Sequence, residues 1–169
     1  MHSHFDKADW KEFFLDEICN INSGVRLTKA NMNEGKMPFI GATDSNNGIT
    51  NFVSNTNKSL DKNVLGVNYN GSVVENFYHP YECIFSDDVK RISFKDDEEQ
   101  NKYCYLFLKQ MILKQKEKYR YAYKFNGDRM ARQKIMMPVD KHARIDFDLL
   151  KRYIVAIEMK KIKILLQNC

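Results

Sequence analysis

The segment from Lys118 to Arg132 carries the side chains that a nucleic-acid surface would need. Its cations can contact phosphates, because clustered lysine and arginine release counterions when they neutralise a polyanion. Asparagine and arginine can also form two hydrogen bonds to one base edge in the major groove of duplex DNA. The candidate DNA-binding residues of this segment are Lys118, Arg120, Tyr121, Tyr123, Lys124, Asn126, Arg129 and Arg132.

The tyrosines of this segment have two interpretations. Tyr119, Tyr121 and Tyr123 alternate with other residues, several of them basic, so they either touch sugars and bases or brace the loop. Alternating aromatic residues are equally typical of a strand with one buried face. The tyrosines alone therefore do not decide between a DNA-binding loop and a strand.

Two earlier loops are further candidates for DNA contact. Arg26 and Lys29 follow a glycine, which would let the main chain approach a phosphate closely. Asn46 and Asn47 precede Gly48, a sequence that favours a turn, because Asn and Gly readily adopt left-handed conformations. We expect a turn there, with base reading by the two asparagines as the alternative.

Residues for catalysis, metal binding or a cofactor do not stand out. The four cysteines and four histidines are scattered along the chain, without the spacing of a zinc site. Glycine-rich phosphate and dinucleotide loops are not recognisable. Asp87 and Asp88 are adjacent, but consecutive acids usually mark a solvated turn. We therefore expect no catalytic residue, no metal and no cofactor.

Charge is distributed unevenly along the chain. Residues 1–101 contain 10 lysines and arginines against 16 aspartates and glutamates, a net charge of −6. Residues 102–169 contain 17 against 6, a net charge of +11, although the whole chain carries only +5. This asymmetry favours a polyanionic partner for the second part, with a solvated helix face as the alternative.

The first part of the chain has the pattern of short strands joined by polar turns. Residues 10–18 fit a strand or an amphipathic helix equally well. The pair Asn70-Gly71 lies between two apolar runs, 64–69 and 72–74, which predicts a hairpin. Further strands are expected at residues 38–41 and 89–94.

Helical spacing dominates the second part. Apolar residues at three- and four-residue steps predict a helix over 101–116, and the run 134–138 predicts a last buried strand closed by Pro138. Asp146 is a suitable N-cap for a terminal helix of about 20 residues. The apolar stripe of that helix exceeds what one domain can cover, which predicts partner binding. The candidate partner-binding residues are Leu150, Tyr153, Ile154, Ile157, Ile162 and Leu165.

These elements predict an α+β fold. A single domain over residues 1–143 would contain a mixed, curved β-sheet with packed helices, and a long helix over 144–169 would follow it. No apolar run approaches the roughly 20 residues that span a bilayer, and the N-terminus lacks the pattern of a secretory signal. We therefore expect a cytoplasmic protein without a membrane partner.

Several segments together resemble the target recognition domain of type I restriction-modification specificity subunits, and the related recognition subunits of BcgI-like enzymes. The resemblance depends on the order and spacing of the segments along nearly the whole chain. They are Trp10 with Phe13-Phe14-Leu15 and Ile18, Ser23 to Lys29, Pro38 to Thr43 leading to Asn46 to Ile49, Asn70-Gly71-Ser72, Tyr119 to Lys124, and Ile135 to Pro138 before the terminal helix. This chain resembles one half of such a subunit.

The resemblance implies a non-catalytic subunit that reads one half of a split site in double-stranded DNA. Residues 144–169 would form a spacer helix at the start of a coiled coil, which docks methyltransferase subunits and the restriction subunit. S-adenosylmethionine, Mg2+ and ATP would belong to those partner subunits. The chain would be either a half subunit that forms a homodimer through this helix or a part of a longer chain.

Two other function classes stay open at this point. One is a protein-interaction module that oligomerises through its terminal helix without binding DNA. The other is a small metal-dependent hydrolase that uses Asp87 or Asp88.

Overall fold

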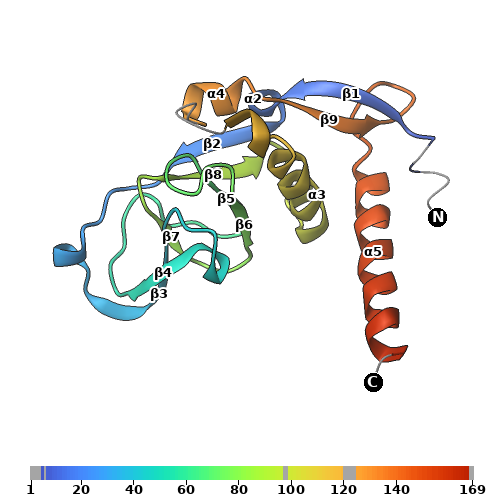
Figure 1. Ribbon diagram of the computed structural model, residues 1–169. Helices are drawn as coiled ribbons and strands as arrows, with labels where there is room; N and C mark the ends of the chain where they lie inside the picture. The colour runs from blue at the N-terminus through green and yellow to red at the C-terminus, as the bar shows by residue number, and fades with distance from the viewer. Residues whose placement is uncertain (1–4, 6, 97–98, 120–124, 168–169) are drawn as a thin grey trace.

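The computed structural model describes residues 5, 7–96, 99–119 and 125–167. Within these residues the strands form three sheets, and helices pack against them. Figure 1 shows a body of curved strands and short helices, with one long helix at its side. The α+β fold class expected from the sequence is confirmed.

A four-stranded antiparallel sheet forms the centre of the fold. Its strands lie in the order β2 (Cys19–Ser23), β8 (Val89–Phe94), β5 (Val64–Asn68) and β6 (Asn76–His79). Strand β5 is buried along its whole length. Its alternate residues face opposite ways, so that Leu65 and Val67 join the core cluster with helix α3 (Lys102–Leu113), whereas Val64 joins a second cluster with Phe85.

A smaller mixed sheet packs beside the first. Strand β3 (Glu34–Ile40) pairs antiparallel with β4 (Ile49–Val53) and parallel with β7 (Ile84–Phe85). The strand predicted at residues 38–41 is therefore confirmed, although it begins earlier. Between β3 and β4 lies the short turn η2 (Asn46–Gly48), and the helical turn η1 (Lys29–Asn31) precedes β3.

A two-stranded ribbon joins the two ends of the domain. Strand β1 (Asp9–Phe14) pairs antiparallel with β9 (Lys134–Val139), and a single helical turn, α2 (Leu15–Ile18), leads from β1 into β2. Residues 10–18, which fit a strand or a helix equally well in the sequence, thus form a strand followed by one turn of helix. The predicted last strand is confirmed, but it continues through Pro138 to Val139, and it is not buried throughout, because Lys134 and Met136 are exposed.

The hairpin at Asn70-Gly71 has a longer loop than the sequence predicts. Strand β5 ends at Asn68 and β6 begins at Asn76, so residues 69–75 form the connection and the strand expected at 72–74 is wrong. Val74 has a φ of +71°, which is rare for a β-branched residue. Its side chain is fully buried and its N–H donates to Asn68 O. Tertiary packing therefore overrides the local preference of this loop.

Helix α3 lies within the helix predicted over 101–116 but ends at Leu113, and its buried face contains the predicted apolar residues together with Tyr105. Asn101 caps it by accepting hydrogen bonds from the N–H groups of Tyr103 and Cys104. A helical turn, η4 (Lys116–Tyr119), follows, and the five-residue helix α4 (Gly127–Ala131) precedes β9. The buried face of α3 consists of Cys104, Tyr105, Phe107, Leu108, Met111 and Ile112.

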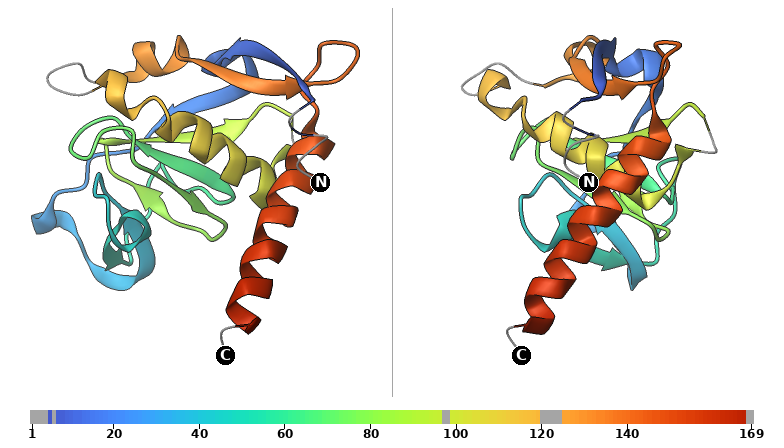
Figure 2. Two further views of the ribbon diagram at one scale, coloured as in Figure 1. Left: turned by 45° about the vertical axis from the view of Figure 1, so that its right-hand side comes forward. Right: turned by 90° about the vertical axis from the view of Figure 1, so that its right-hand side faces the viewer.

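The long helix α5 (Phe147–Gln167) begins at the predicted cap, where Asp146 Oδ1 accepts a hydrogen bond from Leu149 N at 2.9 Å. Its first half packs against α3 and its second half extends past the rest of the chain (Figure 2). Ile162 and Leu165 are 50% and 65% exposed. None of the described helices is long and apolar enough to cross a bilayer.

The partner-binding stripe predicted on α5 needs a correction. Leu150 and Ile154 belong to the core of the same chain, with exposed fractions of 0% and 8%. Tyr153 is half-buried and stacks on Phe5 with ring centres 3.7 Å apart. These residues are covered because α3 and Phe5 lie against the first turns of the helix. The exposed apolar surface therefore begins further along α5.

We expect Leu150→Ala to lower the free energy of unfolding by about 2 to 5 kcal/mol, because it empties a fully buried site. Denaturant titration of both variants would measure this effect. Leu165→Ala is the matched control on the same helix, and we expect it to change stability by less than about 0.5 kcal/mol. Equal losses for the two variants would show that α5 does not pack on the domain as described.

Candidate nucleic-acid interface

Five loops lie close together on one side of the molecule. They comprise residues 23–29, 42–48, 69–75 and 86–88, together with the segment 125–132 that contains the short helix α4. We call the surface that they form the loop face, and we count this segment among its loops. The loop face lies away from α5 in Figure 1 and in the left view of Figure 2. Three of the segments that carry the family resemblance, at 23–29, 46–49 and 70–72, contribute to it.

The Lys90 side chain contacts two of these segments and lies close to the backbone of a third. Its Nζ donates a hydrogen bond to Ser23 Oγ at 2.7 Å and lies 4.9 Å from the centre of the Tyr69 ring. A Cβ added to Gly127 would lie 3.7 Å from the same Nζ. Ser23 and Lys90 are directly opposite in the pairing of β2 with β8. One side chain thus joins the loops that begin at residues 23, 69 and 125.

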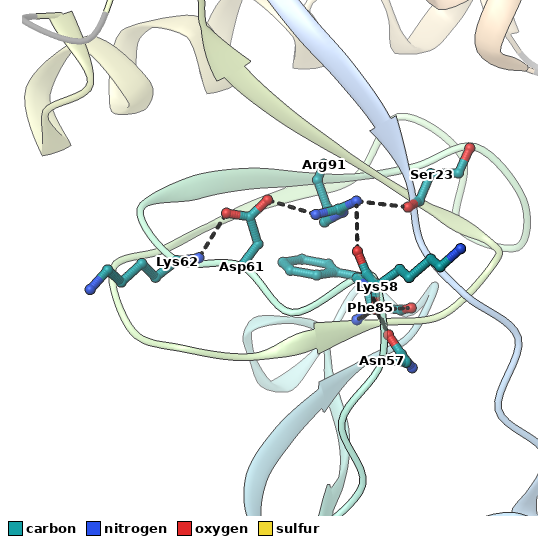
Figure 3. Close-up of polar contacts among 8 residues, drawn as sticks. Ser23, Asn57, Lys58, Asp61, Lys62, Phe85 and Arg91 are labelled. Carbon is teal, nitrogen blue, oxygen red and sulfur yellow. Dashed lines mark hydrogen bonds and ion pairs between the residues drawn. The ribbon is translucent and has the colours of Figure 1, made fainter.

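Ser23 is held from its other side by the next residue of β8 (Figure 3). Arg91 donates a hydrogen bond from Nη2 to Ser23 O at 3.1 Å and one from Nη1 to Asp61 Oδ2 at 2.7 Å. The Arg91 side chain is only 12% exposed, and burial strengthens such an ion pair. Lys90 and Arg91 point to opposite faces of the sheet. Together they fix the position where the 23–29 loop leaves β2.

Arg26 and Lys29, predicted from the sequence, extend from this fixed point into solvent. The Arg26 side chain is 78% exposed and lies 3.8 Å from Asp87 Oδ2. Asp88, the next residue, accepts a hydrogen bond from Asn70 Nδ2 at 2.8 Å. The two acids therefore orient loop residues. No group of three or more metal-ligating side chains occurs among the described residues.

The turn expected at Asn46-Asn47-Gly48 is present. The three residues have φ values of +50°, +53° and +78°, a conformation that Asn and Gly adopt readily. The Asn47 Nδ2 donates to Tyr81 Oη at 2.8 Å. The Nδ2 group of Asn47 is thus engaged within the chain.

Behind this turn, His79 is buried and lies 3.3 Å from Tyr81 Oη through its Nδ1. Burial, aided by the charge of Lys109, lowers the pKa of His79 to about 4 from its ordinary 6.5. The unfolded chain therefore binds a proton between these values that the folded chain does not bind. We expect stability to fall as the pH drops from about 6.5 to about 4, by up to roughly 3 kcal/mol from this group.

The variant His79→Gln tests this dependence, because it removes the titrating ring. Denaturant unfolding of wild type and variant at several pH values would show a wild-type stability that falls more steeply than that of the variant over this range. Parallel pH profiles for the two proteins would contradict a neutral, buried His79.

The Lys118–Arg132 segment is described only at its two ends. Arg120, Tyr121, Tyr123 and Lys124 lie outside the described residues, so their DNA contacts stay predictions. The buried Gln133 side chain accepts hydrogen bonds from Tyr119 Oη at 2.5 Å and from Lys118 Nζ at 3.2 Å. It thereby ties the start of the segment to its end.

Tyr119 and Asn126 have structural roles that differ from base contact. Tyr119 is buried and packs on Phe125 with ring centres 4.4 Å apart, so it braces the segment. Asn126 Oδ1 accepts a hydrogen bond from Arg129 N at 3.0 Å and caps α4. The two bonds to one base that the sequence predicted for Asn126 would need this oxygen. The Nδ2 group of Asn126 is the part of the side chain left for DNA.

The structure describes the two basic candidates at the end of the segment, whose DNA contacts stay predictions. Arg129 is half-exposed in α4, and Arg132 is exposed after its last turn. The sequence analysis did not identify Lys90 or Tyr69 as candidates. Lys90 is part of an ordinary strand pattern, and only the pairing of β2 with β8 brings it beside Ser23.

Comparison with known proteins identifies the family of this chain. A family model described as the type I restriction modification DNA specificity domain matches residues 7–167. The type II restriction enzyme BgcI specificity subunit S.BcgI of Heyndrickxia coagulans is 58% identical over 151 residues. This match covers 89% of the chain and 44% of the relative, so the chain spans less than half of the relative's length.

Solved structures show the same fold at low sequence identity. The S subunit of a type I restriction-modification system from M. genitalium has a TM-score of 0.68 and 18% identity, over 98% of this chain and 42% of that chain. The HsdS subunit from Thermoanaerobacter tengcongensis has a TM-score of 0.65 and 13% identity, over 95% and 40%. Since the family model spans nearly the whole sequence, the resemblance is confirmed, and the chain belongs to the family of type I restriction-modification DNA specificity domains.

Proposed function

We propose that this chain is a non-catalytic module that recognises one half-site in double-stranded DNA through its loop face. The observation that carries the proposal is the convergence of loops 23–29, 69–75 and 125–132 around one cation. Loops of this kind, held on a rigid sheet, are typical positions for binding residues. The exposed cations Arg26 and Arg132 lie on these same loops.

The contacts divide into those that position the DNA and those that read it. Phosphates are the partners expected for the exposed cations Arg26, Lys29, Lys118 and Arg132, because such contacts fix register without sequence information. Base edges are the partners expected for Arg129, the Asn47 oxygen and the residues between Tyr119 and Phe125. The sequence that is read depends on both groups and on DNA deformability.

We also infer that the second half of α5 docks a partner protein. Met159, Ile162 and Leu165 are 63%, 50% and 65% exposed, and exposed apolar side chains of this density on one helix mark an interaction surface. A methyltransferase subunit is the partner that the family membership favours, with a second copy of this chain as the alternative. Tyr153 and Ile157, both half-buried, would border that surface.

The division of the chain follows from these two surfaces. Residues 1–143 would form the recognition domain and 144–169 the spacer helix, with S-adenosylmethionine, Mg2+ and ATP bound only by partner subunits. We expect the assembly to act in the cytoplasm, where it meets the DNA that it reads.

Selection from a random duplex library tests this function. The chain, together with a methyltransferase subunit of the same system, would be incubated with the library at two salt concentrations, and bound duplexes would be sequenced. Enrichment of one short half-site is the expected result. Salt-sensitive binding without enrichment would contradict sequence recognition. If the chain binds the methyltransferase subunit but no duplex, the result would favour an interaction module.

A further inference from the structure

We propose that Lys90 binds a phosphate of the recognised DNA and so holds the three surrounding loops against the backbone. This inference rests on the proposed function, and it assigns a DNA contact to a residue of the central sheet. Lys90 lies in β8 rather than in any of the loops, so its Cα position is fixed by pairing with both β2 and β5.

The first support is the charge around Lys90. Its Nζ has two neighbours, the Ser23 hydroxyl and the face of the Tyr69 ring, and both are neutral. Among the described residues, no carboxylate lies within ion-pair distance of this Nζ. By contrast, Lys102 and Lys134 pair with Glu158 and Glu12 at 2.7 and 2.6 Å.

The acids in the neighbouring turn are engaged elsewhere. Asp87 lies 3.8 Å from Arg26, and Asp88 accepts the hydrogen bond from Asn70. Lys90 is half-buried, and a cation that is partly removed from water gains from a counter-ion. A DNA phosphate at the loop face would supply that negative charge.

The second support is the geometry of the ammonium group. Lysine has three donors; Ser23 Oγ accepts one, and the Tyr69 ring covers a second direction through a cation–π contact. The remaining donor has no partner among the described residues. Because two neighbours already orient the side chain, little conformational entropy is lost when a phosphate binds.

The third support is the space beside Lys90. A Cβ on residue 127 would lie 3.7 Å from both Cε and Nζ of Lys90, so the backbone at Gly127 passes close to the ammonium group. A side chain longer than alanine at this position would extend toward the region that a phosphate must reach. The glycine therefore keeps access to Lys90 open from the side of α4.

The variant Lys90→Gln tests the proposal through the salt dependence of DNA binding. Removal of one phosphate contact lowers the slope of log K against log salt concentration by about 0.9 and weakens all duplexes alike, by roughly tenfold. Lys90→Arg keeps the charge, so it should restore the wild-type slope. A purely structural role for Lys90 would lower affinity without changing the slope, and that result would overturn the proposal.

The control variant is Lys134→Gln, which removes a cation that is already paired with Glu12; its slope should equal that of the wild type. Acylation of lysines in the wild-type chain, read by mass spectrometry, gives a second test that needs no substitution. Bound duplex should protect Lys90 and leave Lys134 reactive, and equal reactivity of Lys90 with and without DNA would overturn the inference. If the wild-type chain binds no DNA at all, the proposed function fails instead.

Discussion

A chain in which Arg26, Lys29, Arg129 and Arg132 are all replaced by glutamine is expected to lose DNA affinity by roughly 1000-fold at low salt. Each neutralised phosphate contributes about 0.9 to the slope of log K against log salt, so the phosphate contacts of Arg26, Lys29 and Arg132 should lower that slope by about 3. Loss of the base contact of Arg129 adds to the loss of affinity. The loss arises because these cations lie on loops of one face. Fluorescence anisotropy with a labelled duplex at several salt concentrations would measure both quantities.

The matched control removes the same charge from a different surface. Lys151, Lys160, Lys161 and Lys163 all lie on α5, and their replacement by glutamine changes the net charge equally. We expect this variant to keep most of the affinity and slope of the wild-type chain. Equal losses for the two variants would mean that DNA responds to total charge, which would remove the basis for a loop-face site.

Replacing Gly24 with alanine is expected to lower the free energy of unfolding by about 3 kcal/mol and to abolish DNA binding. A Cβ at this position would lie 1.9 Å from Ser86 O and 2.6 Å from Phe85 O. Both are main-chain atoms, so they cannot move aside as a flexible side chain would, and overpacking of this kind displaces backbone. The displaced segment carries Arg26 and Lys29. Denaturant unfolding and DNA titration of the same sample would measure the two effects.

Gly127→Ala is the control for this substitution. The added Cβ would meet Lys90 at an ordinary contact distance of 3.7 Å, and alanine favours the helical conformation over glycine by up to about 1 kcal/mol. We therefore expect unchanged or slightly raised stability and near-normal binding. If Gly127→Ala were destabilised and Gly24→Ala were as stable as the wild type, the packing described for both glycines would be contradicted.

The sequence predicts elements whose signals are local. Helix α3 and the cap of α5 at Asp146 follow from apolar spacing and a capping side chain, and both are present. The turn at Asn46-Asn47-Gly48 follows from residues that tolerate positive φ. In each case the determining interactions lie within a few residues of one another.

Features that depend on distant segments were not predictable in the same way. Leu150 and Ile154 have the spacing of a partner-binding stripe, but only the tertiary packing of α3 shows that their own chain buries them. The longer loop at 69–75 follows from burial of Val74. Lys90 becomes a candidate only because strand pairing places it opposite Ser23.

The DNA-binding candidates show the same division. The exposure of Arg26 and Arg132 was predictable from charge and neighbouring turns, and their contacts with DNA stay predictions. The cap that Asn126 provides for α4 was not predicted, because an asparagine before a glycine suits a base contact as well as a helix cap.

The most direct test of the central claim is hydrogen–deuterium exchange of the wild-type chain, free and bound to the duplex enriched by selection. If the loop face binds DNA, exchange should slow in residues 23–29, 69–75 and 125–132, while residues 155–167 of α5 should exchange at the same rate in both states. Protection confined to α5, or no protection in the three loops, would contradict recognition through the loop face.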